Sequence, residues 1–215
     1  MLTVLLATAS LTVSQPATVQ APLAEAACMF TRTRVEAFVA NTSADDTRAA
    51  VSASWLSLPM DRADLAATLT QEGRERGSDA PFAMGYRPDF ARAIVGLTDA
   101  QLDLFHDRLT TDGPIQCPGI ETQADPFNAD IGGFQRWAEE QMMNPDPGAP
   151  PGAATLAISR PVDFDGGARV LVAEAYTFTP IPLSRPPSAS LVFAVYQRDG
   201  AQWRREASII AARAG

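Results

Sequence analysis

The chain has 215 residues, 46% of them apolar and 20% charged, which suits a globular protein with a real core and excludes wholesale disorder. Its formal net charge of −8 argues against non-specific binding to nucleic acids or anionic membranes, because both require a basic surface. All 17 Lys or Arg positions are arginine, so Schiff-base chemistry, pyridoxal phosphate attachment, the Ser-x-x-Lys pair and the Walker phosphate loop are excluded, since each requires a lysine.

The N-terminal stretch has features of a signal peptide. Residues 2–13 are apolar and uncharged, and this run is shorter than the about 20 residues that span a membrane. Ala24-Glu25-Ala26 offers the small-x-small pattern that a signal peptidase cleaves. We therefore expect residues 1–26 to be a signal peptide, and the mature chain to be periplasmic or secreted with no membrane-inserted segment. No basic residue precedes Arg32, which keeps open the alternative of a cytoplasmic protein with an apolar leader.

Two cysteines, Cys28 and Cys117, fit export. An even count in an exported protein predicts a disulfide. The alternative is a pair of free thiols in a cytosolic protein. Their wide separation excludes a Cys-x-x-Cys redox motif and a four-cysteine zinc site.

Residues 27–143 carry the signals of helices. Ser43 is a candidate N-cap, and apolar residues follow it at the i, i+4 and i+7 spacing of a helix face: Val51, Trp55 and Leu58. We predict that a helix begins at Ser43.

Two further helices are predicted after it. The first buries Leu65 and Leu69 on one face. The second begins at a capping box formed by Thr98 and Gln101. Its apolar stripe consists of Leu102, Phe105 and Leu109.

The composition changes after another predicted helix over residues 134–143. Residues 144–152 contain four prolines, which remove backbone donors and fix φ, so a linker is expected there. Residues 153–212 then contain four β-like runs: Thr155–Val162, Arg169–Phe178, Ala189–Gln197 and Ala201–Ile210. The patterns predict an α+β protein in which a helical N-terminal half packs on a four-stranded antiparallel C-terminal sheet, with residues 27–212 as one compact domain.

The last hairpin turns at Arg198-Asp199-Gly200. Hydrophobic matching favours a three-residue loop with Gly200 as a left-handed bulge. This register pairs Val195 with Trp203, Phe193 with Arg205 and Leu191 with Ala207.

Two charged residues lie among apolar strand residues. Glu174 shares a strand face with Val170, Val172, Tyr176 and Phe178, and Arg205 shares one with Trp203, Ala207 and Ile209. If both faces point at the helices, Glu174 and Arg205 pair in a partly buried pocket, where an isolated charge is costly and a pair is tolerable. The sequence favours the alternative, in which one strand faces the other way and both charges are solvated. The candidate ligand-binding residues of the pocket are Glu174, Arg205, Tyr176 and Trp203.

Three segments of the C-terminal part resemble a pattern found in uncharacterised exported bacterial proteins: residues 158–162, 168–172 and 196–203. The closing hairpin around Asp199-Gly200-Ala201-Gln202-Trp203 is similar to the last hairpin of NTF2-like (cystatin-like α+β) domains. The resemblance implies helices packed on a curved sheet that encloses an apolar pocket. It transfers no catalytic residue.

Catalytic and metal-binding patterns are weak. His106 is the only histidine; it could share a metal with Asp103, but a histidine at the edge of an amphipathic helix is the favoured interpretation. There is no Gly-x-Ser-x-Gly and no Gly-x-Gly-x-x-Gly motif. Residues 128–132 and 163–166 do not match calcium loops. We therefore expect no metal and no cofactor.

The hypothesis that follows is a non-enzymatic exported module that binds a small apolar ligand or another envelope protein through its sheet. The first alternative is a carboxylate-dependent hydrolase. Glu139 and Glu140 do not supply its pair of carboxylates, because neighbouring residues on a helix point apart. The second alternative is a structural or assembly protein of the envelope, which would use the sheet edge or the proline-rich loop Thr179–Ser188.

Overall fold

The computed structural model describes residues 25–44, 47–70, 88–120, 125–127, 143, 152–180 and 188–214. The described helices are α1 (Glu25–Ala44), α2 (Arg62–Leu69), α3 (Pro88–Ala93) and α4 (Asp99–Thr110). The described strands are β1 (Thr47–Ser52), β2 (Asp125–Phe127), β3 (Gly152–Ile158), β4 (Val162–Phe164), β5 (Arg169–Pro180), β6 (Ser188–Asp199) and β7 (Gln202–Ala214).

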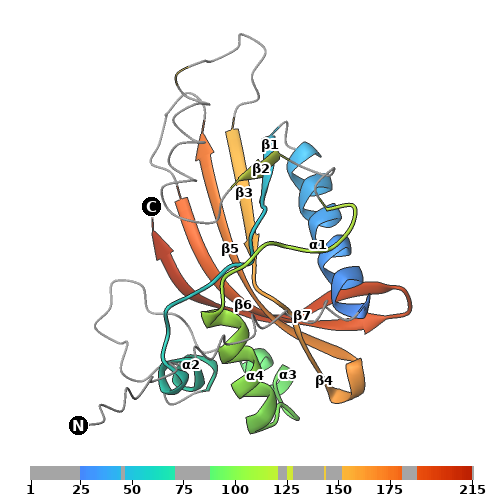
Figure 1. Ribbon diagram of the computed structural model, residues 1–215, viewed down its shortest axis with the longest axis vertical. Helices are drawn as coiled ribbons and strands as arrows, with labels where there is room; N and C mark the ends of the chain where they lie inside the picture. Colours follow the sequence, from blue (N-terminus) through green and yellow to red (C-terminus); the bar gives the residue numbers. More distant parts are fainter. Residues whose placement is uncertain are drawn as a thin grey trace, which may run out of the picture.

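Among these residues, one mixed sheet forms the centre of the fold (Figure 1). Six strands follow the order β2-β1-β3-β5-β6-β7, and the short seventh strand, β4, pairs with β5 beyond the end of β3. The predicted α+β class and the antiparallel pairing of the C-terminal strands are confirmed. The predicted strand count is wrong, because β1 and β2 from the N-terminal half join the sheet and pair parallel to their neighbours.

The first predicted C-terminal strand is interrupted between β3 and β4. Pro161 lies in this gap and has no N–H to donate to a ladder. Ser159, in the same gap, keeps the chain bonded to Ala173 of β5. The Ser159 backbone N–H donates to the Ala173 carbonyl (2.8 Å), and the Ser159 Oγ accepts from the Ala173 N–H (2.9 Å). The side chain thus replaces a backbone acceptor, and β5 stays paired across the gap.

The prediction that a helix begins at Ser43 is wrong. The helix α1 ends at Ala44, and residues 47–52 form the strand β1 instead. Parallel pairing with β3 supplies the hydrogen bonds that a local helix would have made, and it buries Val51 in the core.

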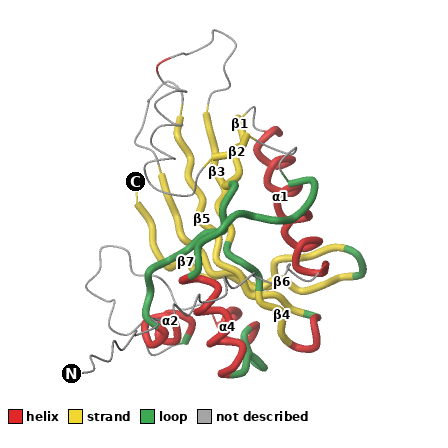
Figure 2. Tube along the Cα trace, viewed as in Figure 1, coloured by secondary structure: helices red, strands yellow, loops and turns green. Residues whose placement is uncertain are grey.

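Both faces of the sheet are covered by helices (Figure 2). The helix α1 packs on one face through Phe30, Val35 and Phe38, which contact a cluster that includes Leu156, Ile158 and Val172. The helices α2, α3 and α4 pack on the other face through a second cluster that includes Leu65, Phe90, Phe105, Leu171 and Phe193. Since strands buried on both faces carry apolar residues at nearly every position, the alternation of the C-terminal strands is weak.

Two predicted helices are confirmed as α2 and α4. Leu65 and Leu69 are buried in α2. In α4 the Gln101 N–H donates to Thr98 Oγ1 (3.3 Å) and the Thr98 N–H donates to Gln101 Oε1 (3.0 Å), which completes the predicted capping box. Phe105 is fully buried on the face that this cap orients.

The register predicted for the last hairpin is wrong. A two-residue turn, Gly200-Ala201, connects Asp199 to Gln202, and Gly200 adopts the left-handed region at φ +61°. The bulges lie inside the hairpin, between Val195 and Tyr196 and between Leu191 and Val192. Because each bulge shifts the pairing by one residue, a single matching of apolar residues along one face does not determine the register.

The bulge next to Tyr196 changes which residues share a face. Arg205 lies opposite Tyr196, on the α1 side of the sheet, whereas Ala207 and Ile209 belong to the cluster on the opposite side. The expectation that Arg205 shares its face with Ala207 and Ile209 is therefore wrong, because the extra residue Glu206 reverses the alternation.

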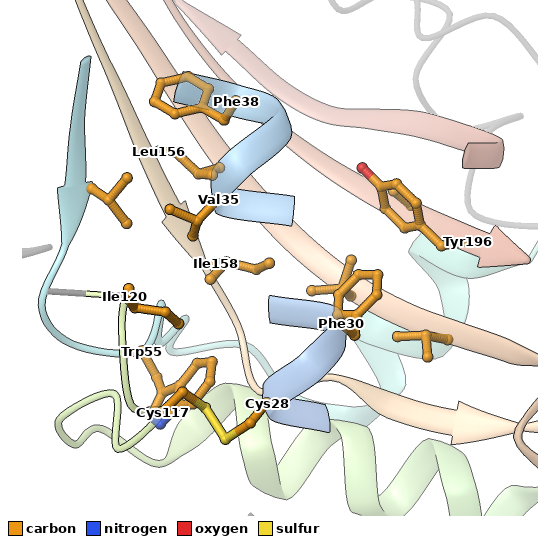
Figure 3. Close-up of a cluster of buried hydrophobic side chains, with 14 of the residues drawn as sticks. Cys28, Phe30, Val35, Phe38, Trp55, Cys117, Ile120, Leu156, Ile158 and Tyr196 are labelled. Atoms are coloured by element: carbon orange, nitrogen blue, oxygen red, sulfur yellow. A yellow bond between two sulfur atoms is a disulfide. The ribbon is translucent and has the colours of Figure 1, made fainter. Parts of the chain in front are cut away.

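The predicted disulfide is present between Cys28 and Cys117, with Cα atoms 5.3 Å apart. It connects the first turn of α1 to the segment after α4 and lies beside Trp55 (Figure 3). Among the described residues, no helix is long and apolar enough to cross a membrane. Several predictions fall outside the described residues: the signal peptide up to residue 24, the helix over residues 134–142, Glu139 and Glu140, and most of the two proline-rich segments.

Candidate functional site

The site forms around Glu174, whose side chain is 0% exposed. Glu174 lies in the middle of β5 on the face that points toward α1, where Val170, Val172 and Tyr176 are its neighbours along the strand. A carboxylate in such a place loses its hydration, so it needs compensating partners.

Four side chains from four elements contact this carboxylate. Arg34 of α1 donates from Nε to Oε1 (2.6 Å), and Arg205 of β7 donates from Nη2 to Oε2 (2.6 Å). The Tyr196 hydroxyl of β6 lies 2.9 Å from Oε1 and 3.1 Å from Oε2. The Tyr176 hydroxyl of β5 donates to Oε2. We call these five residues the Glu174 cluster.

The arginines and tyrosines of the cluster also contact one another. Both guanidinium groups donate to the Tyr176 hydroxyl, Arg205 at 2.7 Å, and Arg205 Nε donates to the Tyr196 hydroxyl at 3.0 Å. The guanidinium carbons lie over the Tyr196 ring, 5.6 Å from its centroid for Arg34 and 5.4 Å for Arg205. Each phenol therefore accepts from a cation and donates to the carboxylate, which is a cooperative arrangement.

The cluster keeps its two arginines charged and its two phenols protonated. Burial opposes the charge on Arg34 and on Arg205, but the interactions with Glu174, Tyr176 and Tyr196 together outweigh it and raise the pKa of both guanidiniums. Burial and then the same carboxylate raise the pKa of Tyr176 to about 12, and they also raise the pKa of Tyr196. With Glu174 as a carboxylate, the cluster holds two cations, one anion and two neutral phenols.

The cluster reaches solvent at one end. The Arg34 side chain is 13% exposed and the Arg205 side chain is 38% exposed. Trp203 lies two residues before Arg205 on the same face of β7, and its ring contacts Phe30 of α1 edge-on at 5.3 Å between centroids. The Trp203 indole N–H is buried and has no hydrogen-bond partner among the described residues.

Three of the four predicted ligand-binding residues therefore lie together. Glu174, Tyr176 and Arg205 are in direct contact, so the solvated alternative for the two charges is wrong. Trp203 lies on the same side of the sheet and contacts Phe30.

Sequence reasoning missed Arg34 and Tyr196. A signal for Arg34 was present: Thr31, Val35 and Phe38 follow the i, i+4, i+7 spacing of a helix face, and all three are buried. That spacing places Arg34 one turn before Phe38, on the side that faces the sheet. Tyr196 could only be placed with the correct hairpin register.

His106, the other candidate residue, and its expected metal partner Asp103 each have a partner within the fold. Its Nε2 lies 2.9 Å from the Met60 carbonyl, and Asp103 pairs with Arg62 of α2. No group of three or more His, Cys, Asp and Glu side chains within the described ranges could hold a metal ion.

Comparisons of the chain with protein-family models, with curated proteins and with solved structures gave no match. The resemblance to NTF2-like domains stays an expectation from the sequence.

Proposed function

We propose that the protein is a non-enzymatic binding module of an oxidising, exported compartment, and that its ligand contacts the end of the Glu174 cluster marked by Arg205 and Trp203. The observation that carries the proposal is the difference in exposure between Glu174 and Arg205. Its carboxylate is buried and saturated with donors, whereas Arg205 is more than a third exposed. A group that is both fixed by its neighbours and open to solvent is preorganised to bind.

The same contacts favour binding over a carboxylate-dependent hydrolase. A general base must reach a proton of the substrate, and Glu174 is fully buried behind its four partners. A nucleophilic or basic tyrosine needs a lowered pKa, whereas the pKa values of Tyr176 and Tyr196 are raised.

The disulfide is the observation that supports an oxidising, exported compartment. Disulfides persist in the periplasm and outside the cell, and they are rare in the reducing cytosol. The Cys28–Cys117 bond fixes the first turn of α1, the helix that carries Arg34.

Native mass spectrometry of the oxidised protein tests the proposal. We expect the wild-type protein to carry a small molecule that the Arg205→Ala variant loses. Arg204→Ala is the matched control, because Arg204 is the exposed neighbour on the other face of β7 and contacts Gln197. A wild-type protein that is empty and also binds none of the ligands added to it, or equal occupancy in Arg205→Ala and Arg204→Ala, would contradict the proposal. A stable oligomer without a ligand would favour an assembly protein.

A further inference from the structure

The charges of the Glu174 cluster do not cancel. Two guanidinium groups, from Arg34 and Arg205, face one carboxylate, and both phenols stay protonated. The cluster therefore carries one net positive charge, in a chain whose formal net charge is −8. Because a partly buried charge is costly when it is unpaired, this excess creates a place for one negative charge.

Within the described part of the chain, the hydrogen bonds of the cluster leave some donors unused but no acceptors. The contacts of Arg34 and Arg205 with the rest of the cluster use Nε and Nη2 only. A guanidinium has five N–H groups, two of them on Nη1. The hydroxyl protons of Tyr176 and Tyr196 are directed at Glu174. What the cluster still offers to a ligand is therefore donors, namely the two N–H groups on Nη1 of each arginine.

The Trp203 side chain adds a donor of another kind on this side of the sheet. The Trp203 indole N–H is buried without an acceptor among the described residues, and Trp203 is on the same strand face as Arg205. A buried N–H without a partner costs free energy that an incoming acceptor would recover. This observation does not depend on the charge of the cluster.

We propose that the exposed end of the Glu174 cluster binds a carboxylate, held by the Arg205 guanidinium with Trp203 beside it. The inference rests on the proposed binding function and gives the class of its ligand. A monoanion neutralises the single excess charge, whereas a phosphate dianion would leave a new unpaired negative charge. The partly exposed Trp203 ring, on the same strand face as Arg205, fits an apolar body on the acid.

The test follows the Trp203 indole resonance of the oxidised, ¹⁵N-labelled protein, assigned with the Trp203→Phe variant. The probes are hexanoate, benzoate, the neutral analogue hexanamide and inorganic phosphate. Hexanoate or benzoate should shift the resonance in a saturable way, hexanamide should not, and phosphate should bind more weakly. Arg205→Gln should weaken carboxylate binding by about tenfold or more, since it removes a charged hydrogen-bond partner. Arg204→Gln should leave the affinity unchanged.

Several results would overturn the inference: no shift with either carboxylate, equal shifts with hexanamide, tighter binding of phosphate, or equal weakening by Arg205→Gln and Arg204→Gln. Arg205→Lys keeps the charge without the planar guanidinium, so an intermediate affinity in this variant shows that a loss in Arg205→Gln is not a folding defect. If native mass spectrometry finds a neutral ligand that depends on Arg205, the binding function stands and the carboxylate inference fails. If the protein is empty and no carboxylate binds, both fail.

Discussion

The Glu174→Gln substitution tests the electrostatics of the cluster most directly. It keeps the shape of the side chain but removes the carboxylate that joins Arg34 and Arg205, and it replaces one of the two accepting oxygens by an amide N–H₂ donor. Breaking a buried ion pair by removing one partner costs about 3–5 kcal/mol. Solvent screens part of the contribution of Arg205, whose side chain is 38% exposed, so Arg34, at 13%, sets most of the loss. We expect a loss of about 3–4 kcal/mol in the free energy of unfolding.

Urea denaturation followed by circular dichroism measures this loss, provided that the slope with urea stays constant. Glu206→Gln is the matched control, because Glu206 pairs with one arginine, Arg169, at 3.0 Å and both side chains are about a quarter exposed. The control should lose about 1 kcal/mol or less. If Glu174→Gln costs no more than Glu206→Gln, the buried charges do not stabilise the fold and the reasoning is refuted.

Three further predictions concern other parts of the molecule. Replacing Cys28 and Cys117 by alanine should lower the free energy of unfolding by about 4–5 kcal/mol, from the chain entropy of a loop this long, and the wild-type protein should show a similar loss in reductant; equal urea midpoints with and without reductant would contradict this. The pKa of Tyr176 rises from 10.0 in the unfolded chain to about 12 in the fold, so the unfolded state loses its proton first. Stability should therefore be full below pH 10 and fall as the pH rises from 10.0 toward about 12, and Tyr176→Phe should fall less steeply in the same urea titrations. Thr98→Ala removes the capping box of α4 and should cost about 1 kcal/mol, whereas Thr110→Ala at the other end of α4 should cost less.

Local signals were enough for some elements and not for others. The helix α4 was predictable because Thr98 and Gln101 satisfy the first N–H groups within the segment itself. The strand β1 was not, because its hydrogen bonds go to β3, far along the chain, and Val51, Trp55 and Leu58 happen to repeat at a helical spacing. The helix α1 was overlooked because its first turn overlaps the expected cleavage site at Ala26.

The Glu174 cluster likewise combines residues that the local sequence could place with residues that only the tertiary structure could place. The alternation of β5 placed Glu174 and Tyr176 on one face from sequence alone. Their partners depend on tertiary structure: Arg34 arrives on α1, and the bulge at Glu206 sets which side of the sheet Arg205 faces. A register shift of one residue reverses every side chain that follows it, so the hairpin had to be known before the cluster could be assembled.

The parallel pairing of β1 with β3 also constrains the order of folding. Thr47 pairs with Gly152, so this pairing has to close a long loop of the chain. The meander of β5, β6 and β7 pairs neighbours in sequence and can form quickly, whereas β1 must wait for that long loop to close. Arg34 precedes β1 and Glu174 lies on β5, so we expect their contact to form after the meander, among the last contacts of the fold.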